Sequence, residues 1–535
     1  MKFRSKACLA VACGFVAVAA SAGVVRYVSP DATGAEDEDF TEDHPGTLAN
    51  AIAASVARSS WADGDEIVLL PNSGSTKGVY DCAGLTPNET RCAYYFCDKA
   101  YLKIRGYSGK REDIEFRGKG GEDYRCFRVK NQTSFSGLTF KDFVLTLYLP
   151  KDVSRPGGQN VAPDSTHITG GGGAICSQND AWGNVVSIVS NCAFSACRAG
   201  YGGAVQGCTV YDSLFQDCTF SGEYTSTGGG GVANGTCVGC MFDRCGSAAD
   251  TLTKARGGAT LDCVNSNCVF MTCRASSGAA TGTSANFTET GGENIKCVFT
   301  NCTALSSGNG ICVCGKSTGC LFVDNKGENL VYGLTRNCRI DRCLFVRNTV
   351  SGALLGGNVY NTLVVNNTNT DGNGGTGLFN HGASYNCTVV SNTLGGAATR
   401  YVIGNGSSAY NCLIAGNDGG NEILACAGPI CNCTADRPID ATKSPSSRDF
   451  ELDLNAVKGL RWGVDPEWGV SDVPVGIKGR ASIKGRGSNL KEDETTEIWT
   501  ETDVDYAGKP RLREGEVVDI GCYTYVPNGL MLLLR

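Results

Sequence analysis

Four charged residues stand within a short stretch near position 340. They are Arg339, Asp341, Arg342 and Arg347. A basic side chain can take the proton beside a uronate carboxylate, and Ca²⁺ held by carboxylates can assist that chemistry. Charges scattered along a chain are also typical of a solvated face. We therefore treat these residues as the candidates for polysaccharide cleavage, and a solvated face as the alternative.

A polar stretch from 369 to 375 offers a second kind of chemistry. Its oxygen-bearing side chains alternate with other residues, and Asp371 and Asn373 are spaced as ligands are in calcium-binding loops. The stretch lacks the later bidentate glutamate of such loops, so a flexible loop is the alternative. We expect no other cofactor, and Ca²⁺ only if the chain is a lyase.

The chain has three histidines, His44, His167 and His381. His381 stands between Asn380 and Gly382, a setting typical of a turn, because asparagine and glycine both tolerate left-handed backbone. A turn role is therefore preferred over catalysis for this residue.

Cysteine is abundant, with 30 in 535 residues. Thirteen of these cysteines fall into two columns of the repeat. One column is Cys192, Cys240, Cys268, Cys297, Cys320, Cys343, Cys387 and Cys412, and the other is Cys197, Cys218, Cys245, Cys273 and Cys302. Stacked on neighbouring strands, such residues can form disulfides or serve as compact buried thiols. A metal array is disfavoured, because four ligands do not converge on one point.

These columns belong to a repeat of the form C-x-F-x-x-C or C-x-F-x-x-N, which recurs every 19 to 29 residues. Its centres are Phe194, Phe215, Phe242, Phe270, Phe299, Phe322, Phe345, Val364, Val389 and Ile414. Such a period indicates a stacked solenoid. The units lack helical apolar spacing and hold brief apolar runs that end at turn residues, which predicts strands. We predict an all-β fold, a right-handed, single-stranded parallel β-helix with an N-terminal cap.

The position three residues after each centre changes from cysteine to asparagine along the chain. The asparagines are Asn325, Asn348, Asn367, Asn392 and Asn417. Equivalent residues of a parallel β-helix stack at about 4.8 Å, so these side chains can hydrogen-bond one another while tolerating left-handed backbone. We predict a structural ladder rather than a ligand site.

Three basic residues among the first six precede an apolar run over 7–20 and a small-residue site at 20–22, which is typical of a secretory signal peptide. We predict a signal peptide at 1–22, a cap at 23–60, the parallel β-helix at 61–435, and C-terminal coils and cap at 436–535. No later stretch reaches the roughly 18 apolar residues of a membrane helix. The mature chain is therefore expected to be secreted or on the cell surface, without a transmembrane segment.

The formal net charge is −7, and the chain has no basic stripe of the kind that binds nucleic acid. A nucleic-acid partner is therefore not expected. A polysaccharide, or a glycan or protein of a cell surface, is the expected partner.

The opening Tyr27–Pro30, the strand start at Asp63–Asp65 and the closing Asp519–Gly521 resemble exported bacterial right-handed β-helix proteins of the pectate-lyase-like superfamily. The resemblance covers nearly the whole mature chain. It implies a β-helix that hosts lyases, hydrolases, phage spikes and adhesins alike. The G-H-G motif that pectin-type hydrolases of this superfamily use is absent.

The inner units also resemble the repeats of polymorphic outer membrane proteins, which alternate G-G-A-[ILV] with F-x-x-N. Gly172–Ile175 and Gly202–Val205 match the first motif, and Phe322–Asn325 and Phe345–Asn348 match the second. The adhesin-like repeats favour a non-catalytic protein for adhesion or glycan binding.

The alternative is a polysaccharide lyase or glycoside hydrolase that acts on an acidic polysaccharide. A stacked row of Arg, Lys and Asp from three consecutive coils would favour the enzyme. A face of Ser, Thr and Asn would favour the binding protein.

Overall fold

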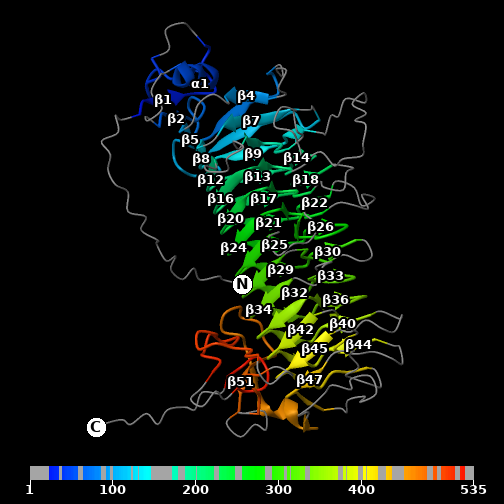
Figure 1. The fold of residues 1–535 in the computed structure, drawn as a ribbon. Helices are drawn as coiled ribbons and strands as arrows, with labels where there is room; N and C mark the ends of the chain where they lie inside the picture. Colours follow the sequence, from blue (N-terminus) through cyan, green and yellow to red (C-terminus); the bar gives the residue numbers. More distant parts are fainter. Residues whose placement is uncertain are drawn as a thin grey trace, which may run out of the picture.

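The chain winds into a long solenoid of short strands (Figure 1). The computed structural model describes residues 23–34, 39–57, 64–85, 92–96, 101–121, 124–130, 132–145, 171–178, 187–200, 202–221, 228–247, 256–283, 292–305, 310–313, 315–331, 338–370, 378–380, 382–395, 402–404, 407–419, 429–436, 451–478, 486–490, 496–512 and 518–524. The predicted signal peptide, His167, His381, Asp371 and Asn373 lie outside these residues.

The coils wind through four parallel sheets, and the middle coils have a strand in each of them. Sheet A contains β1 (Val25–Val28), β2 (Glu66–Leu69), β5 (Lys103–Gly106), β8 (Ser134–Ser136), β12 (Ser187–Ser190), β16 (Cys208–Tyr211), β20 (Thr236–Val238), β24 (Val264–Ser266), β28 (Glu293–Ile295), β31 (Lys316–Thr318), β34 (Arg339–Asp341), β38 (Asn358–Tyr360), β42 (Gly382–Tyr385), β45 (Ser407–Tyr410) and β47 (Ile430–Cys431). Sheet B contains β3 (Gly78–Asp81), β6 (Ile114–Arg117), β9 (Thr139–Lys141), β13 (Ala193–Ser195), β17 (Leu214–Gln216), β21 (Met241–Asp243), β25 (Val269–Met271), β29 (Val298–Thr300), β32 (Leu321–Val323), β35 (Leu344–Val346), β39 (Leu363–Val365), β43 (Thr388–Val390), β46 (Leu413–Ala415), β48 (Thr434–Ala435) and β49 (Glu451–Leu452).

Two smaller parallel sheets close the coil. The ten-stranded sheet contains β10 (Val144–Leu145), β14 (Arg198–Ala199), β18 (Thr219–Phe220), β22 (Gly246–Ser247), β26 (Arg274–Ala275), β30 (Thr303–Ala304), β33 (Lys326–Gly327), β36 (Thr349–Val350), β40 (Thr368–Asn369) and β44 (Thr393–Leu394). The seven-stranded sheet contains β4 (Cys92–Phe96), β7 (Arg125–Lys130), β11 (Ile175–Gln178), β15 (Val205–Gln206), β19 (Val232–Ala233), β23 (Thr260–Leu261) and β27 (Thr281–Gly282). Further along, β37 (Leu355–Gly356) pairs with β41 (Phe379–Asn380). The fold is a parallel β-helix, as predicted.

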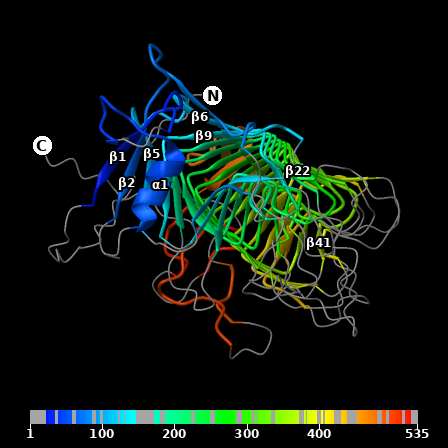
Figure 2. The same cartoon turned by 90° about the horizontal axis from the view of Figure 1, so that it is seen from above.

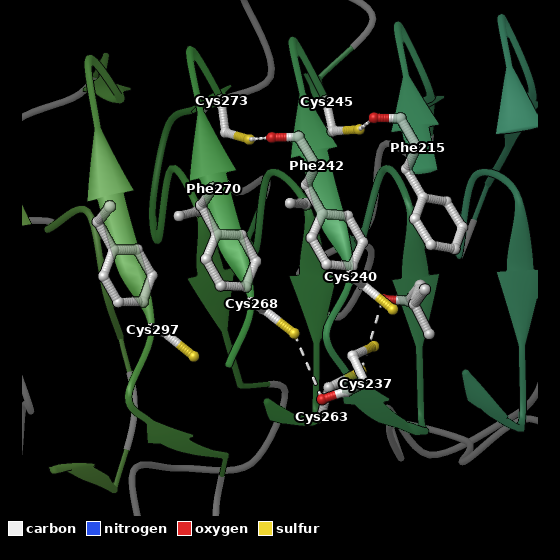
Figure 3. Packing of buried hydrophobic residues seen from close by; sticks show 14 of the residues in the cluster. Phe215, Cys237, Cys240, Phe242, Cys245, Cys263, Cys268, Phe270, Cys273 and Cys297 are labelled. Carbon is white, nitrogen blue, oxygen red and sulfur yellow. Dashed lines mark hydrogen bonds between the residues drawn. The ribbon is translucent and has the colours of Figure 1, made fainter. Parts of the chain in front are cut away.

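The repeat centres stack inside sheet B in register. Phe194 pairs with Phe215 and Phe242 with Phe270, and consecutive ring centroids from Phe140 to Phe345 lie between 4.5 and 5.1 Å apart. That separation is close to the spacing of hydrogen-bonded strands, so each ring covers the next (Figure 3). The aromatic column therefore forms the continuous core that the repeat predicts.

The two cysteine columns are buried beside these rings, and all 25 described cysteines are free thiols. In the column after the centres, each thiol donates to the carbonyl of the aromatic residue one coil earlier. Cys245 Sγ lies 3.6 Å from Phe215 O, and Cys273 Sγ lies 3.6 Å from Phe242 O (Figure 3). Of the alternatives, the structure therefore shows buried thiols.

Asparagine takes over the same bond in the later coils. Asn325 Nδ2 lies 2.9 Å from Phe299 O and Asn348 Nδ2 lies 2.9 Å from Phe322 O, while each amide also donates to the next asparagine of the column. The ladder Asn325, Asn348, Asn367, Asn392 and Asn417 is continuous. These five residues do not have left-handed backbone, contrary to our expectation.

Most left-handed residues other than glycine belong to two separate columns at the corners of sheet B. The first-turn column lies between sheets A and B and contains Asn191, Asp212, Gly239, Asn267, Lys296, Gly319, Arg342, Asn361, Asn386, Asn411 and Asn432. The second-turn column follows sheet B and contains Asp142, Ala196, Asp217, Arg244, Thr272, Asn301, Asp324, Arg347, Asn366, Ser391 and Gly416. Asparagine, aspartate and glycine dominate because they tolerate φ near +50° at low cost. The ladder asparagines follow these turns by one residue.

The G-G-A motif has its own conformational reason. Gly202 has φ +58°, and a Cβ there would lie 2.6 Å from Val205 O. A Cβ on Gly203 would lie 2.1 Å from Gly230 O of the next coil. Only glycine permits this close stacking of backbones.

The N-terminal end is covered by α1 (Leu48–Ala57), which lies across the first coils (Figure 2). Leu48, Ala51 and Ile52 are buried against the core. Beside the helix, Arg26 Nη1 donates to Asp65 Oδ2 at 2.8 Å and to Ser55 Oγ at 3.0 Å, so this buried charge is paired. The helix covers strands that would otherwise expose unpaired edges.

The C-terminal segment, here the described residues from 453 to 524, folds back beside the later coils (Figure 1). It contains η1 (Ala456–Gly459) and an antiparallel pair, β50 (Leu460–Gly463) and β51 (Val473–Ile477). Its apolar side chains bury the outer face of sheet B from Leu321 to Ala415. The segment thus covers the side of the solenoid, whereas we predicted further coils and a cap.

The first-turn asparagines hold this segment. Asn361 Nδ2 donates to Val504 O at 3.0 Å, Asn386 Nδ2 to Asp519 O at 2.7 Å and Asn411 Nδ2 to Ser488 O at 2.7 Å. Arg511, which is fully buried, donates through Nε to Asn361 Oδ1 at 3.0 Å. Burial lowers the pKa of Arg511, and Asp505 and Asp519 partly offset this effect.

We predict that Asn348→Ala lowers the free energy of unfolding by about 1–3 kcal/mol, because it leaves buried ladder groups without partners. Asn348→Cys should cost less, since a thiol can still donate to Phe322 O as Cys302 does to Phe270 O. Urea denaturation measures both variants. The control is Asn301→Gly at an exposed left-handed position. An equal loss in the alanine and cysteine variants would contradict the equivalence of the two side chains.

We predict that the buried thiols make the fold sensitive to alkali. Burial raises the pKa of Cys192 and of Cys522 from 9.0 to about 12. Because the folded pKa exceeds the unfolded value, this contribution to stability is complete below pH 9 and is lost as the pH rises toward 12. Thermal unfolding measured between pH 7 and 11 should therefore show a falling midpoint above about pH 9.

Thiol labelling gives the control for this effect. In the native protein at pH 8, the peptides that carry Cys192 and Cys522 should remain unmodified by iodoacetamide, and they should react fully in denaturant. Rapid native labelling of either peptide would show that its thiol is accessible and would remove the basis of the alkaline effect.

Candidate functional site

Three of the four predicted charged residues gather at one corner of the solenoid. Arg339 and Asp341 are the ends of β34 and both face outward, and Arg342 follows in the first-turn column with φ +51°. Arg342 Nε lies 3.4 Å from Asp341 Oδ2. The strand period of two explains why Arg339 and Asp341 share a face.

Arg347 lies elsewhere, at the second turn on the far side of sheet B. Its guanidinium makes two 3.0 Å bonds to the Asp324 carboxylate one coil earlier. Arg244 binds Asp217 in the same way four coils earlier, with bonds of 2.7 and 3.0 Å. Both pairs are exposed and contribute little to stability. The structure therefore separates Arg347 from the other candidates.

Register extends the Arg339 position into a row on sheet A. Glu293, Lys316 and Arg339 are paired neighbours on β28, β31 and β34. Lys316 Nζ lies 2.7 Å from Glu293 Oε1, and the Arg339 guanidinium carbon lies 4.3 Å from the centre of the Tyr360 ring. We call Glu293, Lys316, Arg339 and Tyr360 the charged ladder. It presents an anion and two cations along the solenoid axis and ends at the Tyr360 ring, which packs between Arg339 and Tyr385.

Asp341 lies beside this ladder in a more enclosed position. Its side chain is 15% exposed, and its Oδ1 atom has no hydrogen-bond partner. Burial raises the pKa of Asp341 above 3.8, and the nearby Arg342 and Arg339 only partly offset that effect. A carboxyl whose pKa is raised beside cationic groups is suited to hold or release a proton.

The C-terminal segment adds a second carboxyl, that of Glu467, near Arg342. Glu467 precedes Trp468 in a turn fixed by Asp465, whose Oδ1 accepts from both backbone N–H groups at 3.0 and 2.9 Å. Desolvation raises the pKa of the otherwise exposed Glu467, and the positive charges of Lys296 and Arg342 act against it. Arg342 is therefore near two carboxyls, one from the coil and one from the C-terminal segment.

The remaining candidates provide no further chemistry within the described residues. His44 is exposed in a turn, where its backbone N–H donates to Thr41 Oγ1 at 3.1 Å. Among the residues whose positions are described, no three His, Cys, Asp or Glu side chains are grouped to hold a metal ion. The same part of the chain contains no helix long and apolar enough to cross a membrane.

Sequence reasoning did not identify Glu293, Lys316, Tyr360 or Glu467. The first two have a clear signal, because Glu293, Lys316 and Arg339 each precede a column cysteine by four residues. Aligning the units on those cysteines places all three charges in one row. Glu467 has no such signal, since it lies where the repeat has ended.

No family model and no curated protein matches the chain. Among solved structures, the chain is similar to pectate lyase Pel9A, at 9% identity and a TM-score of 0.25, over 95% of this chain and 98% of that one. It is also similar to the polysaccharide lyase Pedsa3628 of Pseudopedobacter saltans, a family PL6 enzyme, at 11% identity and a TM-score of 0.30, over 84% and 98% of the two chains. A third match is PfbA, a surface adhesin of Streptococcus pneumoniae, at 12% identity and a TM-score of 0.27, over 76% and 91%.

We predict that Asp341→Asn stabilises the protein at pH 7, by about 1 kcal/mol or less. The pKa of Asp341 in the folded protein lies above the ordinary 3.8. At a pH above both values the ionised carboxylate therefore destabilises the folded state, and the uncharged amide of asparagine removes that destabilisation. The gain should vanish below about pH 3.8, the ordinary pKa of an aspartate, because the carboxyl is then protonated in both the folded and the unfolded state. Unfolding midpoints measured across this range provide the test.

Asp217→Asn is the matched control, because Asp217 is an exposed carboxylate paired with Arg244. It should show no gain at pH 7. A loss of stability in Asp341→Asn at pH 7 would mean that Arg339 and Arg342 hold Asp341 ionised, against the expected direction.

Proposed function

We propose that this chain is a secreted or cell-surface β-helix protein that binds a glycan along the charged ladder. The single observation that carries glycan contact is the alignment of Glu293, Lys316 and Arg339 on consecutive coils, with Arg339 packed over the Tyr360 ring. Such a row of charges also suits an enzyme, and we prefer the binding protein because the G-H-G motif is absent and the repeats resemble those of polymorphic outer membrane proteins. Carboxylate, ammonium and guanidinium groups are hydrogen-bond partners for sugar hydroxyls.

The axis of the solenoid supports an extended ligand rather than a compact one. Successive rows rise by about 4.8 Å, so polar groups recur along the ladder at a spacing comparable with that of sugars in an extended chain. Thr236, two coils before Glu293 in the same row, is partly buried and adds a hydroxyl group to the face. A glycan lying along the axis would contact several coils at once.

Export and a surface role belong to the same proposal. They are supported by the basic and apolar pattern of residues 1–22 and by the G-G-A and F-x-x-N repeats, which resemble those of polymorphic outer membrane proteins. Cleavage after Ala22 would give an exported chain that begins at Gly23. Mass spectrometry of the exported protein tests this, and an intact N-terminus would exclude it.

A polysaccharide lyase or glycoside hydrolase is the second candidate. It is favoured by the row of charges from three consecutive coils and by the raised pKa of Asp341 beside Arg339 and Arg342. In that case Asp341 would exchange a proton with the substrate, and Arg339 and Arg342 would hold its negative charge. Ca²⁺ belongs to this second candidate only in the case of a lyase.

We predict that Arg339→Met weakens glycan binding at least tenfold, which is about 1.4 kcal/mol. The purified mature chain is first screened for retention by immobilised acidic and neutral polysaccharides with Ca²⁺ present, and the affinity for the retained glycan is then compared between variants. Arg347→Met is the matched control, because Arg347 is equally exposed on another face and bound to Asp324. Equal loss in both variants, or no retention at all, would contradict the proposal.

The same incubations distinguish binding from catalysis. Absorbance of unsaturated products and new reducing ends report lyase and hydrolase activity respectively. Product release that Asp341→Asn abolishes, while retention of the glycan persists, would establish the enzyme. Retention without product would establish the binding protein.

A further inference from the structure

The first-turn column binds polypeptide backbone wherever another segment covers it. Asn361, Asn386 and Asn411 donate to carbonyl oxygens of the C-terminal segment, as described above. Near the other end of the solenoid, Asn191 Nδ2 donates to Gly109 O of the 107–113 loop at 2.8 Å. One side chain at one register position thus donates to backbone carbonyls of two unrelated segments.

The stretch beneath the C-terminal segment has a second property, an apolar outer row on sheet B. Each residue of this row lies two positions after a first-turn residue. Leu321, Leu344 and Leu363 of the row are buried beneath the C-terminal segment. This corner therefore binds a peptide in two ways. Its asparagines donate to backbone carbonyls, and its leucines pack against apolar side chains.

Between the two covering segments the same corner is open. The apolar row continues in register as Leu214, Met241, Val269 and Val298. Met241 is 42% exposed, and the other three are half-buried, Val298 against the apolar cluster that includes the C-terminal segment. Asn267 in the adjoining turn is exposed, and its Nδ2 donates to the neighbouring Ser266 Oγ at 3.3 Å. We call Leu214, Met241, Val269, Val298 and Asn267 the open strip.

Both ends of the open strip are marked by the covering segments. At one end Arg111 of the 107–113 loop donates to Asp212 O at 3.2 Å. At the other end Glu467 of the C-terminal segment approaches Lys296. An extended segment lying on the strip would therefore fill the gap between two segments that already bind the same corner.

We propose that the open strip docks an extended, apolar polypeptide segment of a partner protein. Apolar side chains of the segment would cover Met241 and Val269, and its backbone would accept a hydrogen bond from Asn267. The strip is aliphatic rather than lined with the polar groups that a glycan requires, which favours a peptide. This site is separate from the charged ladder, so it does not depend on the proposed glycan.

The chain supplies its own probe, because residues 465–478 of the C-terminal segment contain Val470, Val473 and Ile477, which cover the adjacent part of the same row. A fluorescent synthetic peptide of this sequence is titrated with the full-length protein, and anisotropy reports binding. We expect saturable binding that Met241→Lys weakens at least tenfold. Asn267→Gly, which keeps the left-handed backbone, should weaken it several-fold.

Leu452→Lys is the matched control, because Leu452 is an apolar residue 53% exposed on the last strand of sheet B. It should leave peptide binding unchanged, and circular dichroism of each variant confirms that the fold is kept. The proposal is overturned by absence of saturable binding, by equal binding of a scrambled peptide, or by binding that Met241→Lys leaves intact. Displacement of the peptide by a soluble glycan would assign the strip to a glycan and would equally overturn it.

Discussion

The structure depends on one constraint, the fixed rise from strand to strand in a parallel sheet. Because successive coils are in register, each inward side chain meets its counterpart one coil away at about 4.8 Å. Ring centroids of 4.5 to 5.1 Å along the phenylalanine column show that flat side chains fill this distance without gaps. Residue choice at one position is therefore constrained by the same position in the coils before and after it.

This constraint explains why cysteine and asparagine occupy one column. The group that needs satisfying is the carbonyl of the residue in the aromatic column one coil earlier, and either a thiol or a carboxamide can donate to it. Cys302 bonds to Phe270 O at 3.6 Å, and Asn325 bonds to Phe299 O at 2.9 Å. The amide adds a bond to its own neighbour, whereas the smaller thiol adds apolar contact with the core.

Much of this architecture could be predicted because it is local and repeated. Spacing alone gives the strands, the aromatic core and the asparagine ladder, and Arg339 and Asp341 share a face because strands have a period of two. The left-handed residues could not be assigned correctly from the ladder, since they precede it by one position. Glu467 could not be placed either. Its electrostatic interaction with Arg342 is between the solenoid and a segment outside the repeat.

The outer faces of the strands record which coils another segment covers. Strands beneath the C-terminal segment, such as Leu344–Val346 and Leu363–Val365, are apolar on both faces because both faces are buried. Thr388 is an exception, and its Oγ1 accepts from the Cys522 N–H of the covering segment at 3.0 Å. Strands near the start of the repeat, such as Ala193–Ser195, alternate. Met241–Asp243 is intermediate, apolar at its first outer position and acidic at the second. A partner there can be narrow, covering the side of the strand next to the first turn and leaving the other in water.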